Sequence, residues 1–208
     1  MERVRAINAG LQAGHGLGVG GVQRGLQVRE STFRPAIRVI EVPRTRTYPP
    51  TPENHWLAGP VVPANAALRE CRGAYIARID DDDEWKPEHL ERLLYFAHDN
   101  GFEFVSSAYE TDSKVIEHDG GNPPIGGTQT WLYRSYLAAF KYNGQCWRKS
   151  WNRVNDTDLA QRFRDMGVRI GHLNEVTARV LPRPGETHVG SKAYNENPAK
   201  TLDAFAFN

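Results

Sequence analysis

The spacing of hydrophobic residues predicts three helices in the second part of the chain. Apolar side chains recur every three or four positions, as on one face of a helix, in residues 61–73, 87–101 and 155–167. Each segment ends on a glycine, and two of them have a proline near their start, where the first helical turn accepts it. In the third segment we expect Leu159, Phe163 and Met166 to face the core, with Asn155 or Asp156 as the N-cap.

Short runs of β-branched and aromatic residues predict strands. They occupy residues 36–42, 74–79, 102–110, 168–173 and 175–181. Residues 128–140, TQTWLYRSYLAAF, are apolar and aromatic without a clear period. Because helices and strands alternate, we expect an α/β domain with a mainly parallel sheet, whose ligands bind beyond the carboxyl ends of the strands.

The first sixty residues have weaker patterns. Residues 1–13 have helical spacing, and the glycine-rich residues 14–25 predict a loop that lacks the lysine and the serine or threonine of a phosphate-binding P-loop. Residues 43–60 are rich in proline, which predicts a long loop. The polar residues 182–208 predict an irregular tail.

Composition and charge narrow the class of protein. A chain of 208 residues with 39% hydrophobic and 25% charged residues is typical of one globular domain, and its net charge of +1 argues against a partner bound mainly by electrostatics, such as nucleic acid. Two cysteines, Cys71 and Cys146, form no disulfide framework. No apolar stretch is long enough for a transmembrane segment and no signal peptide opens the chain, so we expect a cytoplasmic protein.

Five consecutive acids, Asp80 to Glu84, follow the strand predicted for residues 74–79. Their mutual repulsion leaves two interpretations, a solvated loop or a cation site. Carboxylate oxygens suit Mg²⁺ and Mn²⁺, which use one or two protein carboxylates together with water and substrate phosphates. Asp80 and Asp82 can turn toward one side and hold a metal with a diphosphate. The spacing of a calcium-binding EF-hand is absent.

The segment around these acids resembles a known family. Residues 65–94, NAALRECRGAYIARIDDDDEWKPEHLERLL, are similar to the central signature of the family 2 glycosyltransferases, which have the GT-A nucleotide-sugar fold. The resemblance implies that Asp80 faces the ribose or the metal, that Asp82 is the metal-side acid, and that Asp81 is a variable spacer. It also implies Mn²⁺ or Mg²⁺ as cofactor and a UDP- or GDP-sugar as donor.

A second segment resembles the same family. Residues 155–173, NDTDLAQRFRDMGVRIGHL, are similar to its Glu-Asp-x-Asp-Leu-x-x-Arg helix, with Asn155 in place of the glutamate. The resemblance implies that Asp156 is the catalytic base that accepts the acceptor hydroxyl's proton, in a single displacement that inverts the anomeric carbon. A role as N-cap alone is the alternative for Asp156, and Asp158 is the alternative base.

Further residues have possible roles by the same resemblance. His188 is a candidate metal ligand, Arg179 and Arg183 are candidates for contacting donor phosphates, and Trp131 and Trp151 are candidates for stacking on an acceptor sugar. Residues 126–130, GGTQT, resemble the turn that lines the acceptor side. Each of these residues has a structural alternative, in the core or on the surface.

The resemblance covers roughly residues 60–181 and defines the expected organisation. We expect one shortened GT-A domain over residues 1–181, divergent over 1–60, in which the first strand or strands of the fold are missing, and a polar tail over 182–208 that covers the active site. The acceptor, whether glycan, lipid or protein, stays open. The alternatives are a non-catalytic nucleotide- or sugar-binding protein of the same fold and a nucleotidyltransferase, whose glycine-rich lysine motif is missing.

Overall fold

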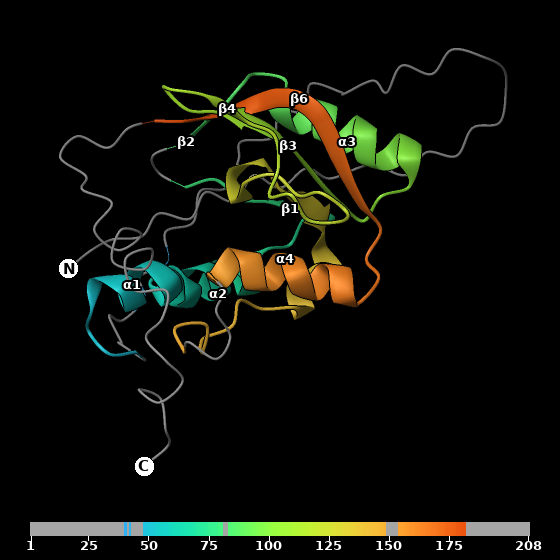
Figure 1. The fold of residues 1–208 in the computed structure, drawn as a ribbon. Helices are drawn as coiled ribbons and strands as arrows, with labels where there is room; N and C mark the ends of the chain where they lie inside the picture. The colour runs from blue at the N-terminus through green and yellow to red at the C-terminus, as the bar shows by residue number, and fades with distance from the viewer. Residues whose placement is uncertain (1–39, 41, 43–47, 81–82, 149–153, 182–208) are drawn as a thin grey trace, which may run out of the picture.

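The computed structural model describes residues 40, 42, 48–80, 83–148 and 154–181 (Figure 1). Its elements, in chain order, are α1 (Pro52–Ala58), α2 (Val61–Glu70), β1 (Tyr75–Ala77), β2 (Asp83–Trp85), α3 (His89–Asn100), β3 (Phe104–Glu110), β4 (Val115–Ile116), the 3₁₀ turn η1 (Thr128–Thr130), β5 (Leu132–Arg134), the 3₁₀ turn η2 (Ser135–Ala139), α4 (Asn155–Asp165) and β6 (Ile170–Val180). None of the helices described here has the length and apolarity needed to cross a membrane.

The three helices predicted from spacing are confirmed as α2, α3 and α4. Gly101 and Gly167 follow α3 and α4 with φ of 67° and 68°, in the left-handed region where glycine carries no Cβ penalty. Three details of these predictions were wrong. Helix α2 ends at Glu70 with Cys71 as its C-cap, and not at Gly73. The N-cap of α4 is Val154, which makes no side-chain capping bond. Met166, just after the helix, is 66% exposed rather than buried.

Residues 52–58 form α1, so the prediction of a continuous loop over residues 43–60 was wrong in this part. Pro52 stands at the start of the helix, where the missing N–H has no intrahelical partner to lose. The Thr51 side-chain oxygen accepts a hydrogen bond from the Asn54 N–H at 3.2 Å and caps the helix. The strand predicted for residues 36–42 lies mostly outside the described residues.

The sheet has the strand order β1-β5-β3-β6-β2, with β4 beside β3. Among the described strands only β3 and β6 pair in parallel, and the other pairs are antiparallel. The prediction of a mainly parallel sheet was therefore wrong, because the segment of unclear period supplied the antiparallel strand β5 and the acidic run supplied β2. The two strands predicted over 168–181 are one strand, β6, with exposed Asn174 and Glu175 at a register shift.

Helices cover both faces of this sheet (Figure 1). Each face has its own cluster of buried hydrophobic residues. On one face α1, α2 and α4 contribute Ala58, Val61, Leu159 and Phe163. On the other face Leu93 and Ala97 of α3 pack against Val105 and Leu132. The domain is thus a three-layer α/β/α arrangement around a mixed sheet.

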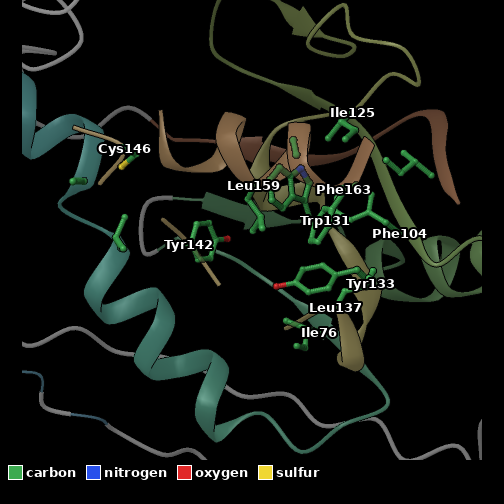
Figure 2. Packing of buried hydrophobic residues seen from close by; sticks show 14 residues of the cluster. Ile76, Phe104, Ile125, Trp131, Tyr133, Leu137, Tyr142, Cys146, Leu159 and Phe163 are labelled. Atoms are coloured by element: carbon green, nitrogen blue, oxygen red, sulfur yellow. The ribbon is translucent and has the colours of Figure 1, made fainter. Parts of the chain in front are cut away.

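Aromatic rings hold α4 against the central strand β3. The Phe104 ring is fully buried and lies 5.2 Å from the Trp131 ring, 5.9 Å from the Tyr133 ring and 5.4 Å from the Phe163 ring, measured between centroids. Figure 2 shows these four side chains together in the cluster. This packing sets the position of α4, and with it the acids at the start of that helix.

Candidate functional site

The acidic run leads from Asp80 into an edge strand. The Asp83 N–H donates to the Asp80 carbonyl at 3.2 Å, and Asp83–Trp85 then form β2, which pairs with the end of β6. The second half of the run is therefore a strand and not a loop, because the exposed edge of β6 offers it backbone partners. Asp81 and Asp82 lie outside the described residues.

Asp80 is paired with an arginine two residues before it. The Arg78 Nε and Nη2 atoms donate to Asp80 Oδ1 at 3.2 and 3.0 Å, and Nη2 also donates to Oδ2 at 3.2 Å. The Arg78 side chain is 18% exposed, whereas that of Asp80 is 42% exposed. The carboxylate thus faces solvent while the guanidinium behind it is largely buried.

Tyr142 connects this pair to helix α2. Arg78 Nη1 donates to the Tyr142 hydroxyl at 3.0 Å, and the guanidinium lies over the Tyr142 ring at 5.3 Å. The Asn65 side chain holds the Tyr142 backbone through two hydrogen bonds of 2.9 Å, one from Asn65 Nδ2 to the Tyr142 carbonyl and one from the Tyr142 N–H to Asn65 Oδ1. Sequence reasoning missed Arg78 and Tyr142, although a charged residue inside an apolar strand was a visible signal for the first.

Trp85, at the end of the acidic run, packs on a buried histidine. Its indole N–H donates to the Gln129 carbonyl at 2.6 Å, and its ring stacks on His89 with centroids 4.7 Å apart. His89 Nδ1 lies 2.6 Å from the Thr177 hydroxyl. Burial lowers the pKa of His89 to about 4, so a neutral imidazole supports this side of the site at pH 7.

The first turn of α4 is held by side chains other than Asp156. Asn155 is 3% exposed, and its Nδ2 donates to the Leu57 carbonyl of α1 at 2.9 Å. Asp158 is 2% exposed and accepts a hydrogen bond of 2.9 Å from Arg162 Nε. Asp158, the alternative base, is therefore buried and occupied by an ion pair.

Asp156 is half-buried and has one oxygen available. Its Oδ1 accepts from the Thr157 N–H at 2.6 Å and from the Thr157 hydroxyl at 3.4 Å, while its Oδ2 has no hydrogen-bond partner among the described residues. The carboxylate therefore satisfies a free amide of the helix start through one of its two oxygens.

Acids of the acidic run and of helix α4 lie near the same two tyrosines, Tyr142 and Tyr109. Burial raises the pKa of Tyr142, Arg78 opposes the increase, and the nearby Asp156 and Asp80 carboxylates add to it. Burial also raises the pKa of Tyr109 in β3, and the Asp83 and Asp156 carboxylates act in the same direction. The end of β1, the start of β2 and the start of α4 thus converge around Tyr109 and Tyr142.

The glycine turn before η1 presses against the same strand. A Cβ on Gly126 would lie 2.0 Å from the Ser107 carbonyl oxygen, and one on Gly127 would lie 2.8 Å from the Tyr109 ring. Only glycine allows the turn to approach β3 this closely. The predicted acceptor-side turn therefore lies beside Tyr109, close to where the acids converge.

Of the two tryptophans predicted to stack on an acceptor, Trp131 lies in the core. It is 2% exposed, its ring packs edge-on against Phe104, and its Nε1 donates to the Gly126 carbonyl at 2.8 Å. The predicted acceptor contact of Trp131 was wrong, because its faces are buried by protein.

The candidate donor contact Arg179 is exposed on β6 opposite Glu84 and donates to Asp112 at 3.1 Å. Arg183, His188 and Trp151 lie outside the described residues.

The donor atoms present fit a metal ion that arrives with its own phosphate ligands. Within the described ranges, no three histidine, cysteine, aspartate or glutamate side chains gather closely enough to hold a metal ion by themselves. Mn²⁺ and Mg²⁺ need only one or two protein carboxylates when a diphosphate and water fill the other positions. The exposed carboxylate of Asp80 meets that requirement.

Comparison with known proteins identifies the family of this chain. The chain is similar to a protein of Bacillus subtilis (strain 168) called "Putative teichuronic acid biosynthesis glycosyltransferase TuaG", with 36% identity over 52 residues, which are 25% of this chain and 21% of that protein. The matched segment is thus about a fifth of the relative's length. The family model described as "Glycosyl transferase family 2" matches residues 53–163, more than half of the chain, from α1 through most of α4. The chain belongs to glycosyl transferase family 2.

Proposed function

We propose that this protein transfers a sugar from a nucleotide-diphosphate donor, a UDP- or GDP-sugar, to an acceptor hydroxyl with inversion at the anomeric carbon. Family membership supports glycosyl transfer. The single observation that carries the site assignment is the common neighbourhood of Asp80 and Asp156 at Tyr142: Arg78 donates to both Asp80 and the Tyr142 hydroxyl, and the Asp156 carboxylate raises the pKa of Tyr142. The two aspartates come from the end of β1 and the start of α4, the two segments that carry the family motifs.

In this mechanism Asp156 is the general base. Its Oδ2 has no partner among the described residues and can accept the acceptor hydroxyl's proton as the hydroxyl oxygen attacks the anomeric carbon. Asp158 is not available for this step, because it is buried and paired with Arg162. A single displacement by an oxygen held at Asp156 breaks the bond to the diphosphate and inverts the carbon.

Asp80 and Asp82 would hold a divalent metal ion, Mn²⁺ or Mg²⁺, together with the donor diphosphate. When bound, such an ion stabilises the negative charge on the departing diphosphate. In our proposal His188 adds a further ligand, and Arg179 and Arg183 contact the phosphates. Trp151 would contact the acceptor.

Calorimetry of the full chain with UDP and with GDP, each with and without Mn²⁺, tests the donor part of the proposal. We expect one nucleotide to bind at least ten-fold more tightly with Mn²⁺, and Asp80→Asn to remove that gain. Glu84→Gln is the matched control, since Glu84 belongs to the same acidic run but is exposed on β2 opposite Arg179. Binding that is absent under every condition would contradict the proposal.

The stereochemistry requires a separate measurement. Proton NMR of the first product formed from a nucleotide sugar of known anomeric configuration should show the opposite configuration. A product that retains the configuration would exclude the single displacement and the role of Asp156 as its base.

A further inference from the structure

Arg78 lies directly behind the carboxylate proposed to bind the metal ion. We propose that Arg78 is a built-in counter-ion for Asp80, which keeps the site from binding a metal ion alone and makes metal binding depend on the donor diphosphate. The inference rests on the proposed function, because it concerns the same metal site. Arg78 is here a positioning residue, which acts through Asp80.

The hydrogen bonds of Arg78 leave it little freedom for another task. Its Nε and Nη2 atoms are directed at Asp80, and its Nη1 atom is directed at the Tyr142 hydroxyl. All three guanidinium nitrogens therefore have partners within the protein. A guanidinium used in this way orients a carboxylate instead of reaching out to a phosphate.

The position of Arg78 is fixed by the surrounding fold. Tyr142 is 4% exposed and is held to α2 by the two hydrogen bonds with Asn65. The guanidinium also lies over the Tyr142 ring. Its side chain is 18% exposed, so moving it aside would leave a buried cation without its partners.

The charge of Arg78 has opposite effects on two kinds of ligand. A free divalent cation meets a carboxylate that is already neutralised, with a second positive charge in direct hydrogen-bond contact with it. A metal–nucleotide diphosphate brings extra negative charge, which the guanidinium attracts. The diphosphate also brings oxygen ligands, which Mn²⁺ and Mg²⁺ use together with one or two protein carboxylates.

Titration of the full chain with Mn²⁺, followed by the electron paramagnetic resonance signal of free Mn²⁺, tests this role. We expect Arg78→Met to bind Mn²⁺ alone at least ten-fold more tightly than the wild type, because the competing charge is gone. Arg78→Lys keeps the charge and should stay within about three-fold of the wild type. An Arg78→Met variant that binds Mn²⁺ no more tightly than the wild type, or no differently from Arg78→Lys, would overturn the proposal.

Arg92→Met is the control for simple loss of a positive charge. Arg92 lies on α3, on the other face of the sheet, is 53% exposed and pairs with Glu175. Its replacement should leave Mn²⁺ binding unchanged. A ten-fold gain in this variant as well would mean that net charge, and not the contact with Asp80, governs metal affinity, and would also overturn the proposal.

A second measurement needs no stable variant at position 78. In a nitrogen-15 spectrum of arginine side chains, the Arg78 Nε–H signal should shift when Mg²⁺ and UDP are added together, and much less with the same concentration of Mg²⁺ alone. An equal shift with Mg²⁺ alone would contradict the inference.

The failure of this inference can be distinguished from the failure of the proposed function. If the wild type binds Mn²⁺ with UDP but Arg78→Met has unchanged affinity for Mn²⁺, only the role of Arg78 fails. If neither protein binds Mn²⁺ under any condition, the proposed metal site fails with it.

Discussion

The two sides of the candidate site each contain an aspartate–arginine pair, but the pairs face in opposite directions. On the β1 side the arginine is buried and the acid faces solvent, with side-chain exposures of 18% for Arg78 and 42% for Asp80. On the α4 side the acid is buried and the arginine is more exposed, with 3% for Asp158 and 30% for Arg162. The same two residue types therefore present a carboxylate to ligands in one place and hold a helix in the other.

The supports behind the two sides differ as well. Behind the acidic run, Trp85 stacks on the buried His89, which contacts Thr177 of β6. Behind the start of α4, Asn155 donates to the Leu57 carbonyl of α1, and Cys146 Sγ donates to the same oxygen at 3.1 Å. The support behind the acidic run thus includes a titratable ring, whereas Asn155 carries no charge and burial raises the pKa of the Cys146 thiol to about 11.

The largest expected effect is on the rate of sugar transfer, and it distinguishes Asp156 from Asp158, the two acids at the start of α4. Asp156→Asn should lower transfer by about 10²–10⁴-fold, the usual contribution of a general base, while nucleotide binding with Mn²⁺ persists. Asp158→Asn should keep its turnover per folded molecule within a few-fold of the wild type. Steady-state kinetics with parallel calorimetry checks both variants. If Asp158→Asn lost transfer and Asp156→Asn kept it, the assignment of the two acids would be reversed.

The next largest effect is on the free energy of unfolding, when the buried ion pair of α4 is broken. Arg162→Ala should destabilise the fold by about 3 kcal/mol, since it leaves the buried Asp158 carboxylate without its partner. Urea denaturation at pH 7 measures this loss. The double variant Arg162→Ala/Asp158→Asn should recover part of it, because no charge then remains buried. A single variant as stable as the wild type would show that Asp158 reaches water, contrary to its burial.

The smallest effect is the pH dependence of stability that His89 confers on the side of the acidic run. The pKa of His89 is about 4 in the folded protein, below its ordinary value of 6.5, so the unfolded chain binds more protons between these values. The stabilisation is therefore complete above pH 6.5 and is lost as the pH falls toward 4. From pH 6.5 to 5 the loss from His89 is roughly 2 kcal/mol, at 1.36 kcal/mol per unit.

Urea denaturation of the wild type and of His89→Gln at pH 6.5 and pH 5 measures this dependence. The variant should lose less stability over the interval. His172, whose pKa burial also lowers, acts in the same direction, so some pH dependence should persist in the variant. Equal slopes for the two proteins would mean that His89 does not titrate differently on unfolding.

Several features of the fold and of the site follow from local sequence. The helices α2, α3 and α4 follow from residue spacing, and α3 and α4 also from glycine stops, since these properties depend on neighbours within a few positions. The sheet was less predictable. β5 and β2 formed where the edges of β3 and β6 offered partners, and such long-range pairing leaves little trace in a segment such as Asp83–Trp85.

The sequence by itself determined that this chain carries the motifs of glycosyl transferase family 2, because those motifs are contiguous runs with set spacing. Only the tertiary structure decided what each charged or aromatic residue does. It placed Trp131 in the core, buried Asp158 against Arg162, and put Arg78 behind Asp80. The physical reason is that burial and charge pairing arise from segments distant in the chain, such as Tyr142 with Arg78 and Leu57 with Asn155.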